Sequence, residues 1–391
     1  MPEPRFLVVR LGSLGDIVHT FPAVAALRET FPQSPITWIT HPRWEPLVSS
    51  TSLATEIWAT ETRSLSSIRE IVSRIRKENV STAIDYQGLW KSAALPLFGG
   101  VPRRIGFSSQ TIREWGVPVL YTDRVRCVTT HIAEQNGELS QRAGARQNVA
   151  PFTPRISPQD DAMVRQLLRD CGIDRYVLLS PGGGWRSKCW PAERFGALAQ
   201  QIREARGLRC VLNYGPGEDA LVETIKRASG NAEPVAYSGT LEKLMALARN
   251  ALCIVGGDTG PLHLAVAVGT PSVSIYGPTD PARNGPFPTP AFAGAQLQPE
   301  PRGNAAPPFA DSEAPSPLSS RLSASSSAPQ PWSSRCNQTI LADSETSSRN
   351  IILRVPTAVR DHTRIDETDP AILKISVDEV FAAVRRLIGA E

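Results

Sequence analysis

The sequence predicts an α/β fold made of two consecutive units, each a mostly parallel sheet covered by helices. The chain has 391 residues, a length that suggests two domains rather than one. Short apolar runs typical of buried strands alternate with stretches of helical spacing. The alternation restarts near residue 160, after Pro151, Pro154 and Pro158, which mark the expected linker.

Each element of this prediction follows from local pattern. In the first unit, the apolar run Phe6–Val9 precedes a glycine loop and a helical pattern, and this order is strand, turn, helix. Further strands are expected at residues 36–40 and 82–85, with a helix over 68–77. In the second unit, strands are expected at residues 176–180, 209–213, 252–255 and 272–276, with helices over 191–206, 240–250 and 261–269. Ser376 and Glu379 form a capping box that opens a last helix.

Residues 288–349 differ from both units. They are rich in proline, serine, alanine and glycine, so they cannot bury enough apolar surface to offset their ordering entropy. A disordered insert near the C-terminus is therefore expected. The predicted domains are residues 1–160, residues 161–287 with 350–391, and the insert. The last helix belongs to the second domain or, as an alternative, crosses back onto the first.

Composition excludes several functional classes. With 42 Lys and Arg against 38 Asp and Glu, the net charge of +4 is too small to suggest a nucleic-acid partner. The chain has neither a signal-peptide pattern nor about 18 consecutive apolar residues, so we expect a cytoplasmic protein whose membrane contact is peripheral. Its six cysteines form no close CxxC pair, and reduced buried thiols are expected.

The first candidate site is the segment Gly12–His19, with the sequence GSLGDIVH. Gly12 and Gly15 allow a sharp turn from strand to helix and leave room for a substrate. Asp16 would lie at the end of a strand, where open α/β sheets bind ligands. An alternative is that Asp16 only caps the helix. His19 is either a core histidine or a residue that supports the site.

The second candidate site is PGGGWRSKCWP, residues 181–191. Its glycines, Gly183 and Gly184 among them, allow the backbone to approach a pyrophosphate closely, and Arg186 and Lys188 supply positive charge. The loop lacks the GK[ST] ending of a Walker A motif. A flexible surface loop with solvated charges is the alternative.

The third candidate site, GGDTGPLHLA, residues 256–265, is the most specific of the three. A strand ends in two glycines and a helix begins at Pro261, so backbone N–H groups of its first turn would face a phosphate. Asp258 beside an anionic ligand needs a partner, and Lys188 is the expected one. Alternatively, Asp258 or Thr259 caps the helix and His263 packs against the sheet. No carboxylate pair or His/Cys cluster of metal-ligand spacing stands out, so no metal or other cofactor is expected.

Four segments together resemble family 9 glycosyltransferases, the lipopolysaccharide heptosyltransferases. They are VVRLGSLGDIVHTFPA, AIDYQGLWKSA, SPGGGWRSKCWP and GGDTGPLHLAVAVGTPSVSIYGPTDP, and they span most of residues 5–285 in the order that the family has. The segment Gln87–Ala93 most resembles the heptosyltransferase I branch, and the tail from Ile351 fits the family's end. The insert at 288–349 departs from the family, whose members continue more compactly.

The resemblance implies a GT-B fold, in which two Rossmann-like domains face a central cleft with the acceptor in the first domain and the donor in the second. It implies metal-free, inverting transfer of heptose from ADP-L-glycero-β-D-manno-heptose to a Kdo–lipid A type acceptor, a lipid-linked acidic sugar, in inner-core synthesis. The enzyme would then act peripherally at the cytoplasmic face of the inner membrane. Alternatives are transfer from another nucleotide sugar, a nucleotide-sugar epimerase of the same fold, or a non-catalytic sugar-nucleotide binder.

The resemblance also assigns roles to residues. Asp16 matches the general base, and Lys188 matches the lysine at the donor phosphate. Donor-binding positions by this match are Gly183, Gly184, Lys188, Glu218, Asp258, Thr259, Gly260 and His263, with Glu218 near the nucleoside. Acceptor-binding candidates are Gly15, Arg63, Arg103, Arg104 and Arg113.

Overall fold

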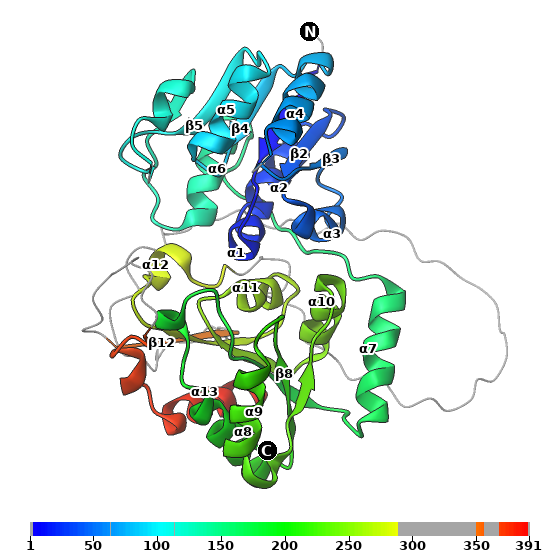
Figure 1. Ribbon diagram of the computed structural model, residues 1–391, viewed down its shortest axis with the longest axis vertical. Helices are drawn as coiled ribbons and strands as arrows, with labels where there is room; N and C mark the ends of the chain where they lie inside the picture. The colour runs from blue at the N-terminus through cyan, green and yellow to red at the C-terminus, as the bar shows by residue number, and fades with distance from the viewer. Residues whose placement is uncertain (1–2, 63, 113, 288–348, 356–366, 390–391) are drawn as a thin grey trace, which may run out of the picture.

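The computed structural model describes residues 3–62, 64–112, 114–287, 349–355 and 367–389. Within these residues the chain forms two α/β lobes, one above the other in Figure 1. Most of the predicted insert, residues 288–348, lies outside the described residues. No helix in the described ranges is long and apolar enough to cross a membrane.

The first lobe is built on a six-stranded parallel sheet with the order β3-β2-β1-β4-β5-β6. Its strands are β1 (Phe6–Val9), β2 (Ile36–Thr40), β3 (Glu56–Ala59), β4 (Thr82–Asp85), β5 (Arg103–Phe107) and β6 (Asp123–Val125). Its helices are α1 (Leu14–Val18), α2 (Phe21–Thr30), α3 (Glu45–Ser49), α4 (Leu65–Lys77), α5 (Trp90–Phe98) and α6 (Ile132–Ala143), with 3-10 turns η1 (Pro42–Trp44) and η2 (Val117–Leu120).

The second lobe repeats this plan with the order β12-β11-β10-β7-β8-β9, again parallel throughout. Its strands are β7 (Tyr176–Ser180), β8 (Arg209–Asn213), β9 (Val235–Tyr237), β10 (Cys253–Gly257), β11 (Ser272–Tyr276) and β12 (Asn350–Arg354). Its helices are α7 (Pro158–Asp170), α8 (Ala192–Arg206), α9 (Asp219–Ala228), α10 (Leu241–Asn250), α11 (Gly260–Ala267), α12 (Pro281–Asn284) and α13 (Val377–Ile388), with 3-10 turns η3 (Arg186–Lys188), η4 (Gly230–Ala232) and η7 (Ile372–Lys374).

Both sheets are doubly wound, with strand order reversing between β1 and β4 and between β7 and β10. Sheets of this kind bind ligands beyond the carboxyl ends of the strands at the point of reversal. The loops after β1 and β4 carry the first motif and Gln87, and those after β7 and β10 carry the second and third motifs. Topology alone therefore gathers the predicted site segments.

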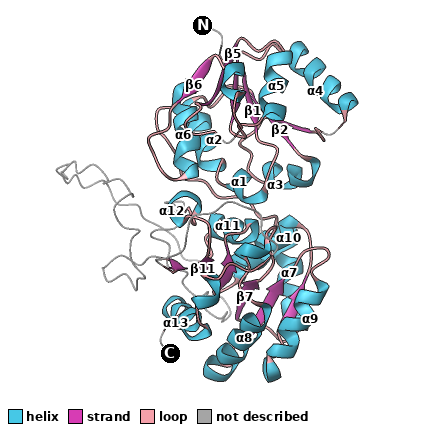
Figure 2. Ribbon diagram, turned by 60° about the vertical axis from the view of Figure 1, so that its left-hand side comes forward, coloured by secondary structure: helices cyan, strands magenta, loops and turns pink. Residues whose placement is uncertain are grey.

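Helices cover both faces of the first sheet. Phe6 and Val8 of β1 pack into one apolar cluster, whereas Leu7 and Val9 pack into another on the opposite face. Such double burial explains why the central strands read as continuous apolar runs. The cluster that contains Phe6 continues into the second lobe through Leu262 of α11, and Figures 1 and 2 both show α1 facing α11.

The structure places both the predicted domain boundary and the last helix. The predicted boundary after residue 160 falls inside α7, which packs against α10 of the second lobe. The capping box of α13 is present, because the Ser376 hydroxyl and amide both donate to the Glu379 carboxylate, at 2.8 and 2.7 Å. α13 packs on α8, β10 and β11, so it stays with the second lobe and does not cross back.

Candidate functional site

The loop after β1 holds Asp16 at the start of α1. The Asp16 carboxylate accepts hydrogen bonds from the Ser13 amide at 3.1 Å and the Ser13 hydroxyl at 3.0 Å. Asp16 therefore does close the first turn of the helix, as the capping alternative predicts. Its side chain nevertheless stays 42% exposed, so the capping contacts leave part of the carboxylate accessible.

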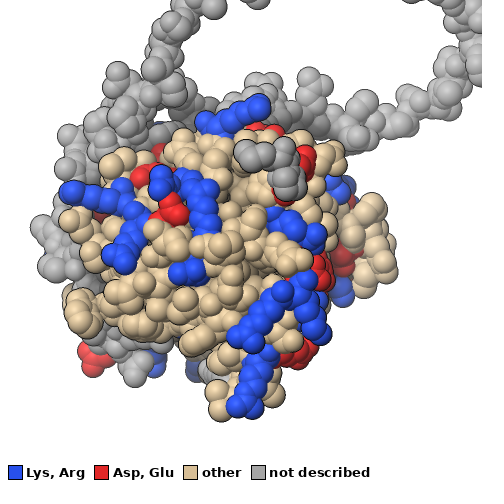
Figure 3. Space-filling model, turned by 90° about the horizontal axis from the view of Figure 1, so that it is seen from above, with Lys and Arg blue, Asp and Glu red and all other residues tan. Residues whose placement is uncertain are grey.

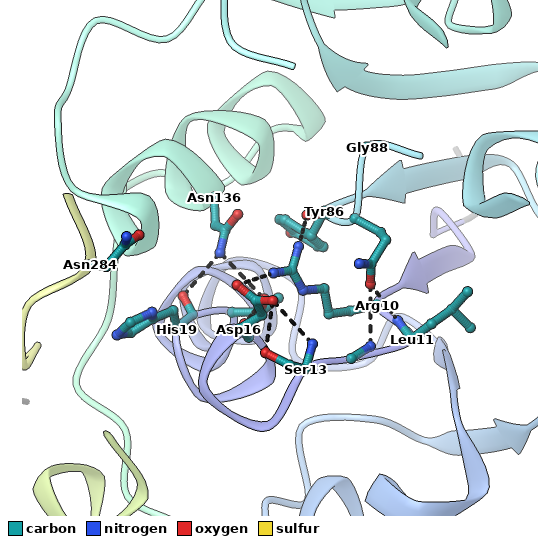
Figure 4. A network of polar contacts seen from close by, with 12 residues as sticks. Arg10, Leu11, Ser13, Asp16, His19, Tyr86, Gly88, Asn136 and Asn284 are labelled. Atoms are coloured by element: carbon teal, nitrogen blue, oxygen red, sulfur yellow. Dashed lines mark hydrogen bonds and ion pairs between the residues drawn. The ribbon is translucent and has the colours of Figure 1, made fainter. Parts of the chain in front are cut away.

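Arg10, which no sequence motif predicted, holds the Asp16 carboxylate through its buried guanidinium. Its guanidinium forms an ion pair with the Asp16 carboxylate at 2.8 Å and donates to the Tyr86 carbonyl (Figure 4). The Arg10 side chain is only 5% exposed. A buried cation in this position orients the carboxylate and keeps its negative charge compensated.

Gln87 and Asp85 hold the neighbouring loop. The Gln87 side-chain carbonyl accepts from the amides of Leu11 and Gly12, at 3.0 and 3.2 Å. Buried Asp85 accepts from the amides of Gln87 and Gly88 and from the hydroxyls of Ser92 and Tyr121. Burial raises the pKa of Asp85, although these hydrogen bonds oppose the rise. The hydrogen bonds of Gln87 and Asp85 together connect the loops that follow β1 and β4, next to Asp16.

On the facing lobe, Asp258 sits between two partners. Lys188 Nζ lies 2.7 Å from one carboxylate oxygen, which confirms the expected pair, and His263 Nε2 lies 3.0 Å from the other. Burial alone would raise the pKa of Asp258, but the His263 hydrogen bond and the Lys188 charge outweigh it and hold that pKa far below its usual range. Asp258 is therefore a fixed anion that positions Lys188 and His263.

The second and third motifs pack into one surface. A Cβ at Gly183 would lie 3.1 Å from both Thr259 Cγ2 and Cys189 Sγ, so only glycine fits there without displacing a neighbour, whereas nothing crowds Gly184. Glu218 accepts from the Gly215 amide at 2.7 Å and its carboxylate lies against Gly182. The structure thus brings Glu218 to the glycine loop.

Two hydroxyls of the second and third motifs are buried and have no hydrogen-bond partner among the residues that the structure describes. They belong to Thr259, the N-cap residue of α11, and to Ser187 in η3. Buried polar groups are normally paired, so an unpaired one in a native fold calls for an explanation. An oxygen-rich anion at the N-terminus of α11 would satisfy the Thr259 hydroxyl and the open amides of the first helical turn.

The two lobes meet through α1 and α11, with almost no space between them. A Cβ at Gly260 would lie 2.6 Å from Leu14 Cβ, and one at Gly15 would lie 3.0 Å from His263 Cδ2. Gly15 thus serves the lobe contact. The Asp16 helix and the helix that begins at Gly260 are adjacent as a result.

Three histidines lie at this junction. The ring of His19 is 4.4 Å from that of His263 and 5.3 Å from that of His131, centroid to centroid. Burial, with the nearby histidine charges, lowers the pKa of His19 well below its ordinary value and that of His131 to about 4. Asn136, also unforeseen, donates to the His19 carbonyl at 3.1 Å. His19 is thus a neutral, buried residue that supports the junction.

The two predicted arginines that the structure describes do not lie at the Asp16 end of the sheet. Arg103 and Arg104 begin β5, level with Thr82 and Ala83 at the opposite end of the sheet. Arg103 pairs with Asp123 at 3.3 Å, and Arg104 donates to the carbonyls of Leu120 and Val101. Strand direction thus places both arginines at the end of the sheet opposite the Asp16 loop, a position that does not favour their predicted contact with the acceptor. Arg63 and Arg113 lie outside the described residues. In the part of the chain that the structure describes, no group of three or more His, Cys, Asp or Glu could hold a metal ion.

Comparisons with known proteins agree with this architecture. The sequence profile of glycosyltransferase family 9 (heptosyltransferase) matches residues 68–299. Lipopolysaccharide heptosyltransferase 1 of Escherichia coli K12 is 29% identical over 303 residues, covering 72% of this chain and 91% of the relative. Lipopolysaccharide heptosyltransferase 3 of the same strain is 24% identical over 279 residues, covering 68% and 80%.

Solved structures share the fold. The E. coli ADP-heptose lipopolysaccharide heptosyltransferase II superposes with a TM-score of 0.70 at 17% identity and covers 98% of both chains. The E. coli heptosyltransferase WaaC, solved with ADP, has a TM-score of 0.59 at 24% identity and covers 73% of this chain and 91% of that one. The two facing lobes are thus those of a GT-B glycosyltransferase. With the family profile spanning more than half of the sequence, this chain belongs to glycosyltransferase family 9 and is a glycosyltransferase.

Proposed function

We propose that the protein transfers heptose from ADP-L-glycero-β-D-manno-heptose to a Kdo–lipid A type acceptor, with inversion and without a metal ion. Relatives at 27–29% identity are lipopolysaccharide heptosyltransferases 1, and one related structure holds an ADP-2-deoxy-2-fluoro heptose. The reaction would belong to lipopolysaccharide inner-core synthesis. Because the acceptor is a membrane lipid, the enzyme would work in the cytoplasm, bound peripherally to the inner membrane.

The observation that carries this proposal is the juxtaposition of α1 with α11. Asp16, fixed by Arg10 and Ser13, lies on a helix that touches the helix opened by Thr259 and Gly260. A carboxylate on one lobe and an anion site on the other are what a glycosyl transfer to a hydroxyl requires.

The chemistry is a single displacement. Asp16 takes the proton of the acceptor hydroxyl as that oxygen forms a bond to the anomeric carbon of the sugar. The bond between the anomeric carbon and the diphosphate oxygen breaks on the opposite face, and its electron pair leaves with ADP. Attack and departure on opposite faces invert the anomeric configuration.

The donor side would stabilise the leaving diphosphate. Lys188 and the amides at the start of α11 provide positive charge where negative charge grows. The hydroxyls of Thr259 and Ser187 would donate to phosphate oxygens. Glu218 lies beside the glycine loop, where it would meet the nucleoside. We propose that these groups replace the divalent metal that many transferases use.

The deciding experiment is transfer by purified protein with ADP-heptose, a Kdo–lipid A acceptor and EDTA, followed by ADP release and product mass. Wild type should release ADP only with acceptor and add one heptose. Asp16→Asn keeps the size of the side chain but removes the general base, so it should lower kcat by about 10²- to 10⁴-fold. Asp174→Asn, a change of the same kind at an exposed carboxylate, is the matched control and should match wild type.

Each alternative outcome has a meaning. ADP-heptose consumed without acceptor, with an altered sugar as product, would indicate an epimerase. Donor binding without turnover, unchanged in Asp16→Asn, would indicate a binder. Transfer from a different nucleotide sugar would leave the role of Asp16 as general base intact but would contradict ADP-heptose as the donor. Activity that EDTA abolishes and Mg²⁺ restores would contradict the metal-free mechanism.

A further inference from the structure

The first lobe carries an apolar stripe along α5 and η2. Its four members are large, exposed side chains: Trp90 is 47% exposed, Phe98 58%, Trp115 93% and Val119 64%. Single exposed apolar residues are ordinary, but a contiguous group on a soluble domain marks an interaction surface. The catalytic mechanism proposed above uses none of them.

The four side chains lie on two elements that pack against each other. Trp90 and Phe98 are the first and last residues of α5. A Cβ at Gly116 would lie 2.9 Å from Trp90 Cζ2, which places the turn beside Trp115 against the indole ring. α5 and η2 are packed together over a small core of Ala93, Val117 and Tyr121.

The stripe starts beside the site and runs away from it. Gln87, which holds the amides of Leu11 and Gly12, is followed three residues later by Trp90 at the start of α5. α5 follows β4 and returns toward the end of the sheet where the strands begin, so Phe98 lies toward that end. Figure 3 looks onto that end of the lobe, where Lys and Arg side chains are exposed with Asp and Glu side chains among them.

Three cations that have no acidic partner among the described residues lie on α4, α5 and β5 beside the stripe. Lys91 is exposed in the first turn of α5, and Arg76 donates its Nε–H to the Phe98 carbonyl at 3.1 Å. Arg104, which does not serve the acceptor cleft, donates to the Leu120 carbonyl at 2.8 Å. Among the described residues none of these three forms an ion pair with an acid. Glu114, which accepts from the Trp90 amide at 2.8 Å, is the acid at its edge.

We propose that this stripe is the surface by which the protein docks on an anionic lipid bilayer. Tryptophan rings favour the headgroup region of a membrane, where apolar and polar surroundings meet. Lysine and arginine beside them attract anionic lipids. Docking by α5 and η2 would bring Trp90, three residues after Gln87, to the bilayer. This docking surface rests on the proposed function in one respect: a lipid-linked acceptor would explain why the surface begins beside the cleft.

Sedimentation with lipid vesicles, without any substrate, tests the surface. Wild type should bind vesicles of phosphatidylcholine with phosphatidylglycerol, and bind pure phosphatidylcholine weakly. The double variant Trp115→Ser with Phe98→Ser should bind about tenfold more weakly. Lys91→Gln should lose about fivefold on anionic vesicles only. The matched control replaces Met163 and Leu167, exposed apolar residues of α7, by serine and should bind like wild type.

Some results would overturn the proposal. One is that the wild-type protein does not bind anionic vesicles. The other is that the Trp115/Phe98 variant binds them as tightly as wild type does. A wild-type dimer in solution that the same variant dissociates would assign the stripe to a second copy instead. Transfer to a water-soluble acceptor separates the two proposals. Vesicle binding without any transfer defeats only the proposed function, and transfer without vesicle binding defeats only the docking surface.

Discussion

At the scale of the residue, the site depends on carboxylates whose charges are fixed by a cation. Asp16 is held by buried Arg10, and Asp258 by Lys188 and His263. The two differ in exposure, with side chains 42% and 7% exposed. That difference suits the roles proposed for them: the accessible carboxylate takes a proton from the acceptor, and the buried one positions a lysine.

The Lys188–Asp258 pair gives a test by double-mutant cycle. Lys188→Met should lower the free energy of unfolding by about 3 kcal/mol, because it leaves a buried carboxylate without its cation. Adding Asp258→Asn should recover most of that loss, since the carboxylate charge is then gone. ADP affinity should fall at least about tenfold in both variants, because the phosphate loses its cation.

Chemical denaturation measures the stability, and calorimetric titration with ADP measures the affinity. Equal stability losses that simply add in the double variant would mean that the two charges do not interact. Unchanged ADP affinity in Lys188→Met would remove Lys188 from the donor site.

At the scale of the element, the contact between α1 and α11 decides whether the two half-sites meet. Two glycines allow it: Gly260 faces Leu14, and Gly15 faces His263. α1 has only five residues, so its position depends on this contact and on the capping by Ser13 and Asp16.

Gly260→Ala should separate the two helices. The added methyl would lie 2.6 Å from Leu14 Cβ, an atom next to the backbone that cannot rotate away. We expect kcat to fall about tenfold or more while each lobe keeps its fold, since misplacing reacting groups by about 1 Å is costly. Steady-state kinetics with far-UV circular dichroism would measure both.

Gly15→Ala introduces a milder clash at the same contact between α1 and α11 and is to be compared with Gly260→Ala. Its methyl would meet the edge of the His263 ring at 3.0 Å, and a side-chain ring can shift by a few tenths of an ångström. The loss in kcat should therefore be smaller than for Gly260→Ala. Wild-type kinetics in Gly260→Ala would show that the close approach is not needed for turnover.

At the scale of the whole molecule, neutral histidines join the lobes. His131 caps α6 by accepting the Ala133 amide at 3.1 Å, and its Nε2 lies 3.1 Å from the Gly285 carbonyl on the other lobe. These partners fit a neutral ring that donates through Nε2. Figure 2 shows α6 on the side of the first lobe that approaches α12.

This arrangement predicts a loss of stability in mild acid. The pKa of His131 is lowered to about 4, whereas an unfolded histidine titrates near about 6.5. Between these two pH values the unfolded chain binds more protons than the folded protein does. The contribution of His131 to the free energy of unfolding is therefore complete above about pH 6.5 and is lost as the pH falls toward 4. The part due to His131 is on the order of 3 kcal/mol.

Urea unfolding at pH 7 and pH 5 would measure this dependence. His131→Asn keeps an oxygen that can cap α6 but removes the titrating ring, so its stability should change less between the two pH values. His41→Asn is the control, because His41 likewise caps a helical turn, η1, by accepting the Arg43 amide at 3.2 Å. An equal pH dependence in wild type and His131→Asn would contradict the assignment.

Much of the fold was predictable from sequence because its central strands are buried on both faces. Residues 6–9, 36–40, 176–180 and 272–276 form strands as expected. The strands β3, β5, β6, β9 and β12 were missed, since they lie toward the sheet edges and carry polar residues such as Glu56 and Arg103. The helices α5, α6 and α7 lacked a clear start signal, apart from Ser157 and Pro158 before α7.

The same division holds for the site. Glycine loops, Asp16, Lys188 and the Asp258–His263 motif can be read from sequence because turn and helix-start chemistry is local. Arg10 and His131 gave no such signal, since each acts on residues distant in the chain. Arg103 and Arg104 were misplaced for a related reason, because a strand's composition does not reveal which of its ends faces the cleft.

By itself the sequence determined the two α/β units, their turns and the residues at the carboxyl ends of the central strands. These depend on side-chain period and on backbone freedom over a few residues. Only the tertiary structure decided that α1 meets α11, that Arg10 pairs with Asp16 and that Arg103 lies at the far end of its sheet. Those relations depend on strand order and on packing between segments up to about 250 residues apart, where the apolar contact of two helices, and no local pattern, fixes which groups meet.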